Sequence, residues 1–285
     1  MAKVVVVTDS IANIPNDMMA GLPIYVLPQR LIWKGQIYRD GVDMRSEEFY
    51  HRLQEETEFP STSQATPMDF IEIYRPLLEK GYEIFSIHVS SRVSGTFNSG
   101  EIARRLLGTE RIELFDSLSG SMAQGWQALG AARAALQGAT LHECRHVVEK
   151  IRDHSSIFFV PATLEFLHRG GRIGGAAAFW GSVFQVKPIL APVQGVIEAV
   201  DKIRTFKRAL DRLVELVEER IGDQSPVRLV GLHANVPELA HELLERARER
   251  LGRQRVIEAF VSGISPALGA HIGPGAVGLG FLAGV

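Results

Sequence analysis

Two loops rich in hydroxyl side chains stand directly before predicted helices. One is Ser94-Gly95-Thr96, and the other is Ser61-Thr62-Ser63-Gln64, which leads to Pro67. A loop that opens a helix presents free backbone N–H groups and the positive end of the helix dipole, which suits a carboxylate or a phosphate. Two such loops in one chain could clamp a single anion from two sides. The same residue types also cap helices without any ligand, and neither loop has the glycine spacing of a nucleotide site.

A third stretch, His271-Ile272-Gly273-Pro274-Gly275, combines a titratable side chain with glycines. The glycines let the backbone turn sharply beside a ligand, and the imidazole of His271 offers a donor near neutral pH. The pattern fits a glycine-rich turn with an exposed histidine equally well. Thr8, Asp9 and Asp116 follow predicted strands, and we interpret them as loop-bracing or capping residues rather than as ligand contacts.

Two groups of basic residues have the composition of anion or partner sites. Arg169-Gly170-Gly171-Arg172 places two guanidinium groups beside glycines, and arginine holds a carboxylate or phosphate through two parallel hydrogen bonds. An arginine pair on a loop is also common on plain surfaces. The run Lys202, Arg204 and Lys207 fits either the solvated start of a helix or a docking face for an acidic partner.

Composition excludes several classes of protein. The 285 residues carry a formal net charge of −2, which argues against a nucleic-acid-binding protein or one held on an anionic membrane. The single cysteine, Cys144, excludes an intrachain disulfide and a cysteine-based zinc site. His142 and His146 lack a third ligand, so we expect no metal site, and no Gly-x-Ser-x-Gly elbow supports a hydrolase.

The sequence also contains no apolar segment of the length that a membrane-spanning helix needs. The apolar run near the N-terminus is too short for a signal peptide, and the uncharged stretches 174–186 and 272–285 are shorter than a spanning helix. We therefore expect a cytoplasmic protein that does not insert stably into a membrane.

The first half of the chain alternates buried strands with helices. Short apolar runs at 3–7, 83–89 and 112–116 predict strands, and helices are expected at 46–56, 68–79, 97–107, 122–136 and 140–153. This alternation is typical of βαβ units, so residues 1–160 are predicted to form a Rossmann-like α/β domain with a parallel sheet. Residues 24–40 are expected to form a hairpin excursion, with strands at 25–33 and 36–39. Ligands of such sheets bind at the carboxyl ends of the strands, where the polar loops would gather.

Residues 161–285 show a different order of predicted elements, with several strands that follow one another directly. Strands are predicted at 188–193, 196–200, 227–233, 255–261 and 275–282, with a small-residue helix at 174–185 and amphipathic helices at 207–221 and 237–251. The hairpins among these strands indicate an α+β domain with a mostly antiparallel sheet.

The polar stretches, taken together, resemble the DegV family of bacterial fatty-acid-binding proteins. The matching stretches span nearly the whole chain, in family order: Val7-Thr8-Asp9-Ser10, Ser61-Thr62-Ser63-Gln64, Ser90-Ser91-Arg92-Val93-Ser94-Gly95-Thr96, Asp116-Ser117, residues 163–173, Lys187-Pro188-Ile189-Leu190 and His271-Ile272-Gly273-Pro274-Gly275. The resemblance implies two domains with a long-chain fatty acid, such as palmitate, buried in a slot between them.

The resemblance also implies roles for individual residues. The carboxylate would be held by the hydroxyls of Thr62 and Ser94 beside the Gly95 N–H, with His271 and Arg169 at the same site. The protein would need no cofactor and would not be a catalyst itself. It would present the bound acyl group to a separate fatty acid kinase, whose acyl phosphate feeds phospholipid synthesis.

Two further expectations complete the sequence-based interpretation. A kinase would dock on Arg172, Lys202, Arg204 and Lys207. The alternative function is an enzyme that acts on a small phosphorylated or hydroxylated substrate through Ser94 and His271.

Overall fold

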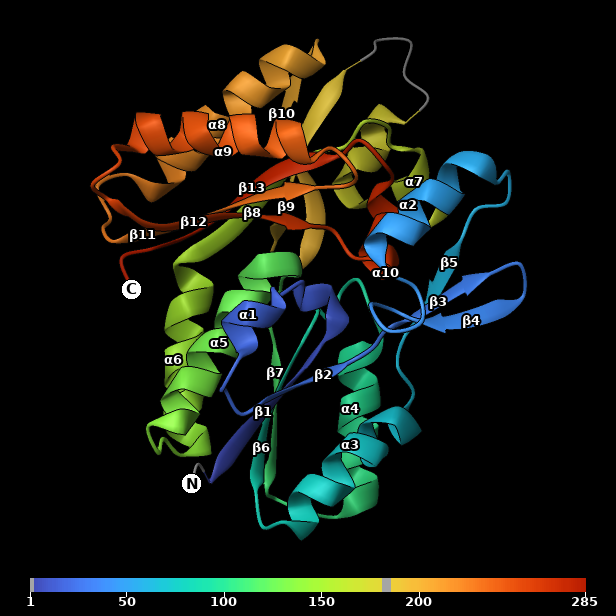
Figure 1. Cartoon of the computed structure of the whole chain (residues 1–285), viewed down its shortest axis with the longest axis vertical. Coiled ribbons are helices and arrows are strands. Elements are labelled where there is room, and N and C mark those ends of the chain that lie inside the picture. The colour runs from blue at the N-terminus through green and yellow to red at the C-terminus, as the bar shows by residue number, and fades with distance from the viewer. Residues whose placement is uncertain (1–2, 181–185) are drawn as a thin grey trace.

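The computed structural model describes residues 3–180 and 186–285, and its first half builds a four-stranded parallel sheet (Figure 1). The strands lie in the order β2-β1-β6-β7, with bounds β1 Val4–Asp9, β2 Ile24–Leu27, β6 Glu83–His88 and β7 Ile112–Asp116. Every residue of β1 is buried. Such burial on both faces is typical of parallel sheets covered by helices, and it explains the continuous β-branched run in the sequence.

Alternate side chains of β1 enter two different cores. Val5 and Val7 pack in the core that contains α3 (Pro67–Glu79) and α4 (Thr96–Leu107). Val4 and Val6 pack in the core formed with α5 (Ser121–Leu136) and α6 (Leu141–Asp153). The predicted α/β class of the first half is confirmed.

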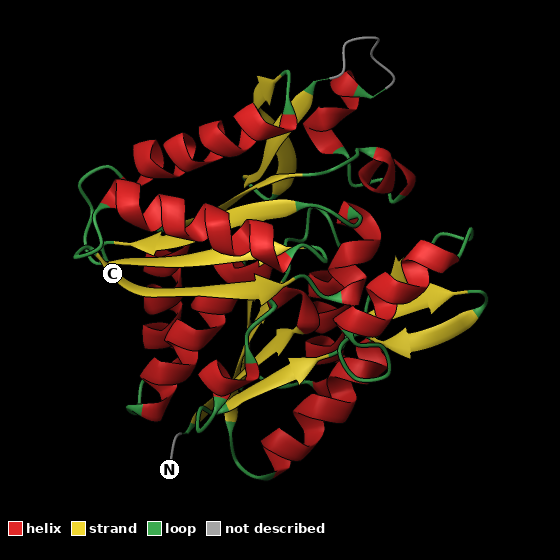
Figure 2. Cartoon of the chain, turned by 45° about the horizontal axis from the view of Figure 1, so that its top comes forward, coloured by secondary structure: helices red, strands yellow, loops and turns green. Residues whose placement is uncertain are grey.

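The second half contains a six-stranded sheet in the order β10-β9-β8-β13-β11-β12. Its strands are β8 Ser155–Val160, β9 Lys187–Val193, β10 Val196–Ile203, β11 Val227–His233, β12 Val256–Gly263 and β13 Val277–Ala283. Neighbouring strands are antiparallel except for β11 and β12, which are parallel. Helices α8 (Phe206–Ile221) and α9 (Pro237–Leu251) cover one face (Figure 2).

Helix α5 lies between the two sheets. Ala128 and Ala132 face the core of the parallel sheet, whereas Met122 and Trp126 pack with Leu232 of β11. Because both sides of α5 are buried, the helix is apolar around most of its circumference instead of being amphipathic. It therefore joins the two halves through a shared apolar contact.

A small three-stranded sheet, β4-β3-β5, lies beside the second sheet (Figure 1). The hairpin of β3 (Arg30–Trp33) and β4 (Gln36–Arg39) turns at Lys34 and Gly35, whose φ values of 50° and 74° fit a two-residue hairpin turn. Its side chains share a core with α2 (Ser46–Glu55) and with Phe159 and Leu190 of the second sheet. The predicted turn is confirmed.

Several sequence-based element predictions are wrong in detail. The stretch Ile24–Leu27 pairs in parallel with β1 and is not the first arm of the hairpin, because Pro28 ends it before β3 begins. The hydroxyl loop at 60–67 contains the strand β5 (Ser61–Ser63). His271 lies on the helix α10 (Pro266–Ile272), not in a turn; the Ser265 hydroxyl caps this helix and Pro266 occupies its first position.

Two further predictions meet the structure only in part. The predicted helix at 174–185 is a 3₁₀ helix, η2, over Gly174–Phe179, and residues 181–185 lie outside the described residues. Strand β8 precedes the predicted domain boundary at Val160 but pairs with β13 of the second sheet. The remaining short elements are η1 (Ser10–Ala12), α1 (Asn16–Met19) and α7 (Glu165–Arg169).

Candidate ligand-binding site

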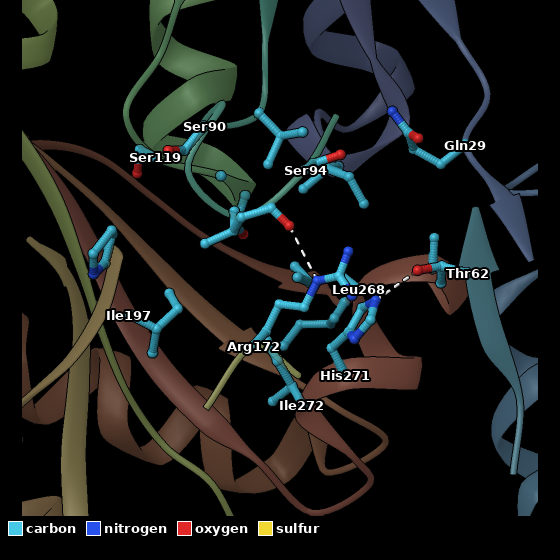
Figure 3. A pocket seen from close by; sticks show the side chains of 18 of the residues that line it. Gln29, Thr62, Ser90, Ser94, Ser119, Arg172, Ile197, Leu268, His271 and Ile272 are labelled. Carbon is cyan, nitrogen blue, oxygen red and sulfur yellow. Dashed lines mark hydrogen bonds between the residues drawn. The ribbon is translucent and has the colours of Figure 1, made fainter. Parts of the chain in front are cut away.

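A cavity lies between the parallel sheet and the second sheet (Figure 3). It encloses about 1080 Å³ of space free of atoms, part of which opens to solvent. Most of its lining is apolar and comes from both halves of the chain: Ile11, Val89, Val93, Ile157, Phe159, Leu167, Ile197, Leu232, Ile264, Ala267, Leu268 and Ile272. A cavity of this size and character suits a mostly apolar small molecule.

One end of the cavity is polar. The hydroxyl Oγ1 of Thr62, on β5, lies 2.6 Å from Nε2 of His271 on α10 (Figure 3). Thr62 is fixed by the pairing of β5 with β3, where it lies opposite Leu31. The hydroxyl-rich loop and the histidine before Gly-Pro-Gly are therefore brought together, as the sequence predicts.

His271 is held neutral at this site. Burial, and then the positive charge of Arg172, lower the pKa of His271 to about 4. Its Nδ1 atom is buried and has no hydrogen-bond partner among the described residues. At neutral pH the ring is therefore an uncharged hydrogen-bonding group beside Thr62.

Arg172 supplies positive charge to the same end of the cavity. Its Nε donates to the carbonyl of Val93 over 3.0 Å, and its Nη1 donates to the carbonyl of Gly170 over 2.7 Å. These bonds hold the side chain along the cavity wall next to His271 (Figure 3). Arg172, predicted from the sequence to belong to a docking surface, lines the cavity in the structure.

Ser94 joins the polar end through a chain of hydrogen bonds. Its Oγ lies 2.9 Å from Oγ1 of Thr96, which accepts from Nε2 of the buried Gln29 over 3.0 Å. The Oε1 atom of Gln29 accepts from the backbone N–H of Ala65 over 3.3 Å. Gln29 therefore ties the two hydroxyl-rich loops together.

Gln29 also lines the cavity, although no motif in the sequence singles it out. Its one signal is that Gln29 and Arg30 are the polar residues between the apolar residues of 24–27 and 31–33. A buried amide needs partners for both its donor and its acceptor atoms, which the two loops provide.

Gly95 is the N-cap residue of α4. A Cβ atom at this position would lie 2.2 Å from Oε1 of Gln64, so the close approach of the two loops favours a glycine.

The remaining predicted residues lie away from the cavity lining. Arg169 donates from Nε to Glu165 over 3.0 Å, and its guanidinium lies 4.0 Å from the centroid of the Phe59 ring. Lys202, Arg204 and Lys207 are exposed where β10 ends and α8 begins. The structure thus brings Thr62, Ser94, His271 and Arg172 to one cavity and places Arg169 and the basic run elsewhere.

Asp9 and Asp116, the last residues of β1 and β7, brace loops, as interpreted from the sequence. Asp9 is fully buried and accepts from the N–H groups of Ile11 and Val89 and from Nδ1 of His88. Asp116 accepts from the N–H of Leu118 in its own loop and from the N–H of Ser91 in the loop after β6. Within residues 3–180 and 186–285, no helix is long and apolar enough to cross a bilayer, and no group of three or more metal-ligating side chains occurs.

Comparison with known proteins assigns the chain to a family. A family model described as "Uncharacterised protein, DegV family" matches residues 3–284. The chain belongs to the DegV family. A DegV domain-containing protein of Listeria innocua is 34% identical over 278 residues, which cover 97% of each chain.

Solved DegV structures share the fold. That of the DegV fatty acid binding protein of Bacillus subtilis superposes with a TM-score of 0.89 and 33% identity, and the match covers 99% of this chain and 100% of that chain. That of a fatty-acid-binding DegV family protein from Thermus thermophilus has a TM-score of 0.89 and 31% identity over 99% of both chains. The predicted family and the predicted fold class are confirmed.

Proposed function

We propose that this protein binds one long-chain fatty acid, such as palmitate, with its carboxylate at the Thr62 end of the cavity. The observation that carries the proposal is the hydrogen bond between Thr62 and His271 at the polar end of an otherwise apolar cavity. The DegV proteins of Bacillus subtilis and Thermus thermophilus, described as fatty acid binding proteins, support it.

The polar end offers the groups that a carboxylate needs. The hydroxyls of Thr62 and Ser94 and the N–H of Gly95 would donate to its oxygens, and Arg172 would offset its charge. Arg169 is left out of this site, because its guanidinium already contacts Glu165 and Phe59.

The acyl chain would supply most of the affinity. Burial of about 14 methylene groups at roughly 0.8 kcal/mol each amounts to on the order of 11 kcal/mol before the costs of association are subtracted. The polar end would set the direction of the chain and would add a smaller share of the affinity.

We propose further that the protein is a cytoplasmic carrier, not an enzyme, and that it presents the carboxylate to a fatty acid kinase for phospholipid synthesis. An enzyme that uses Ser94 and His271 needs these two side chains to pair, whereas their hydrogen bonds run to Thr96 and Thr62. The exposed Lys202, Arg204 and Lys207 are the proposed docking residues for the kinase.

The first test is the identity and affinity of the ligand. Organic extraction of the purified protein should release a long-chain fatty acid that mass spectrometry identifies, and the delipidated protein should bind palmitate again. Thr62→Ala and Ser94→Ala each remove a hydrogen bond to a charged group, worth about 1.5–3 kcal/mol, so each should weaken binding roughly 10- to 150-fold. Thr57→Ala, at an exposed threonine, is the matched control.

The double variant should lose less than the sum of the two single losses, since both hydroxyls contact one carboxylate. Palmitate affinity that is unchanged in both single variants would overturn the assignment of the site. Turnover of acyl esters or sugar phosphates by the purified protein would instead favour the enzyme.

A further inference from the structure

The start of helix α5 carries a cluster of buried polar atoms without partners. In the described part of the chain, the side-chain atoms between residues 119 and 127 that are buried and make no hydrogen bond are Ser119 Oγ, Ser121 Oγ, Gln124 Oε1, Trp126 Nε1 and Gln127 Oε1. Unpaired buried polar groups destabilise a fold, and native proteins pair nearly all of them. Five unpaired buried polar atoms within nine residues therefore require a physical explanation.

Two of these side chains lie at the cavity. Ser119 and Ser121 both belong to its lining, and Ser121 is only 2% exposed. Ser121 is the first residue of α5, a helix of 16 residues whose N-cap, Gly120, provides no side-chain cap. The first N–H groups of α5 and the positive end of its dipole therefore face the same region as the two unpartnered hydroxyls.

This region is distinct from the polar end at Thr62. Figure 3 shows Ser119 on the opposite side of the cavity from Thr62. Apolar lining residues, among them Ile11 and Val89, belong to a core cluster that also contains Ala267 of α10. The neighbouring Ser90 has its hydroxyl occupied, because it donates to the carbonyl of Gly195 over 2.8 Å. The cavity thus has two polar regions and an apolar stretch.

We propose that Ser119, Ser121 and the N-terminus of α5 form a second polar subsite, which takes a neutral oxygen on the chain of the bound fatty acid. This inference rests on the proposed function and specifies the ligand class as oxygenated fatty acids, for which hydroxy acids are the probe. A plain alkyl chain leaves both hydroxyls unpaired, whereas a hydroxyl group on the chain accepts from one of them.

The charge of the lining favours a neutral group over a second carboxylate. Arg172 and His271 are the titratable residues among those that line the described cavity, and both lie beside Thr62 (Figure 3). The N-terminus of α5 alone would attract an anion, but a carboxylate there would be buried with no charged side chain beside it, which costs far more than a hydroxyl with a hydrogen-bond partner.

The experiment compares palmitate with a positional series of monohydroxylated hexadecanoic acids on the delipidated protein. Most isomers should bind at least tenfold more weakly than palmitate, because their hydroxyl is buried against apolar side chains. Isomers whose hydroxyl reaches Ser121 should bind as tightly as palmitate or more tightly.

Variants assign this preference to the subsite. Ser121→Ala should lower the affinity for the preferred isomer about three- to tenfold and leave the affinity for palmitate unchanged or higher. Ser119→Ala provides the same test if Ser121→Ala does not fold, since Ser121 has a φ of 49° that disfavours many replacements. Ser99→Ala, at a buried serine of α4 outside the cavity lining, is the control.

The outcomes separate this inference from the proposed function. Palmitate binding with one preferred isomer that depends on Ser121 or Ser119 supports both. If the protein binds palmitate but binds every hydroxylated isomer more weakly, and if Ser121→Ala and Ser119→Ala leave this order of affinities unchanged, the subsite is overturned. The proposed fatty-acid carrier function is then unaffected. A delipidated protein that binds neither palmitate nor any isomer overturns the carrier function and the subsite with it.

Discussion

Acidification should destabilise the ligand-free protein through His271. The pKa of a histidine in the unfolded chain is near 6.5, whereas burial and then Arg172 lower the pKa of His271 to about 4 in the folded protein. Between these values the unfolded state binds the additional proton, so the free energy of unfolding falls as the pH is lowered. For these two pKa values, the loss between pH 7 and pH 5 is about 2 kcal/mol.

Urea denaturation of the wild-type protein and of His271→Asn at both pH values measures this contribution. Asparagine does not titrate, so the variant should lose about 2 kcal/mol less than the wild type on acidification. Other groups, such as His233, whose pKa is also lowered by burial, titrate in both proteins and cancel in the difference. An equal loss in the two proteins would show that His271 is not held neutral beside Thr62, and the geometry of the polar end would then be wrong.

Three further variants test the loops, the core and the docking residues. Gly95→Ala places a Cβ 2.2 Å from the flexible end of Gln64, so fatty-acid affinity in a direct titration should fall by about 1 kcal/mol. Asp9→Ala leaves three buried donors unpaired and should lower the free energy of unfolding in urea by at least about 3 kcal/mol; a loss below about 1 kcal/mol contradicts the buried network. Arg204→Glu with Lys207→Glu should leave palmitate affinity unchanged and slow acyl phosphate formation by a fatty acid kinase, and an unchanged rate excludes this docking surface.

Short sequence patterns predict those strands and turns whose conformation is set by the residues within them. The β-branched run at 4–7 identifies a strand that is covered on both faces, and this burial is what the structure has. Gly35 marks its hairpin turn, because a two-residue turn needs positive φ values, which glycine adopts readily. The resemblance of several short motifs to the DegV family predicts more than the local patterns do, because it indicates that Thr62, Ser94 and His271, which are far apart in the sequence, share one site.

Elements that depend on tertiary contacts are harder to predict. Strand β5 has only three residues, all hydroxyl-bearing, and it exists because β3 lies alongside it. Helix α10 is short and rich in small residues, although Ser265-Pro266 is a recognisable start signal. No local pattern indicates that Gln29 links the two hydroxyl loops, since its partners are contributed by distant parts of the chain.

The chemistry of the polar end suits the proposed carrier, which would have to release what it binds. Thr62 and Ser94 are neutral donors, the imidazole of His271 is uncharged at neutral pH, and Arg172 already donates to two backbone carbonyls. A carboxylate bound here as proposed would be oriented by hydroxyls instead of being locked in a fully desolvated bidentate ion pair, which is costly to separate. In the proposed complex the apolar chain would supply most of the affinity, so the carboxylate could leave its hydrogen bonds and react while the chain stays bound.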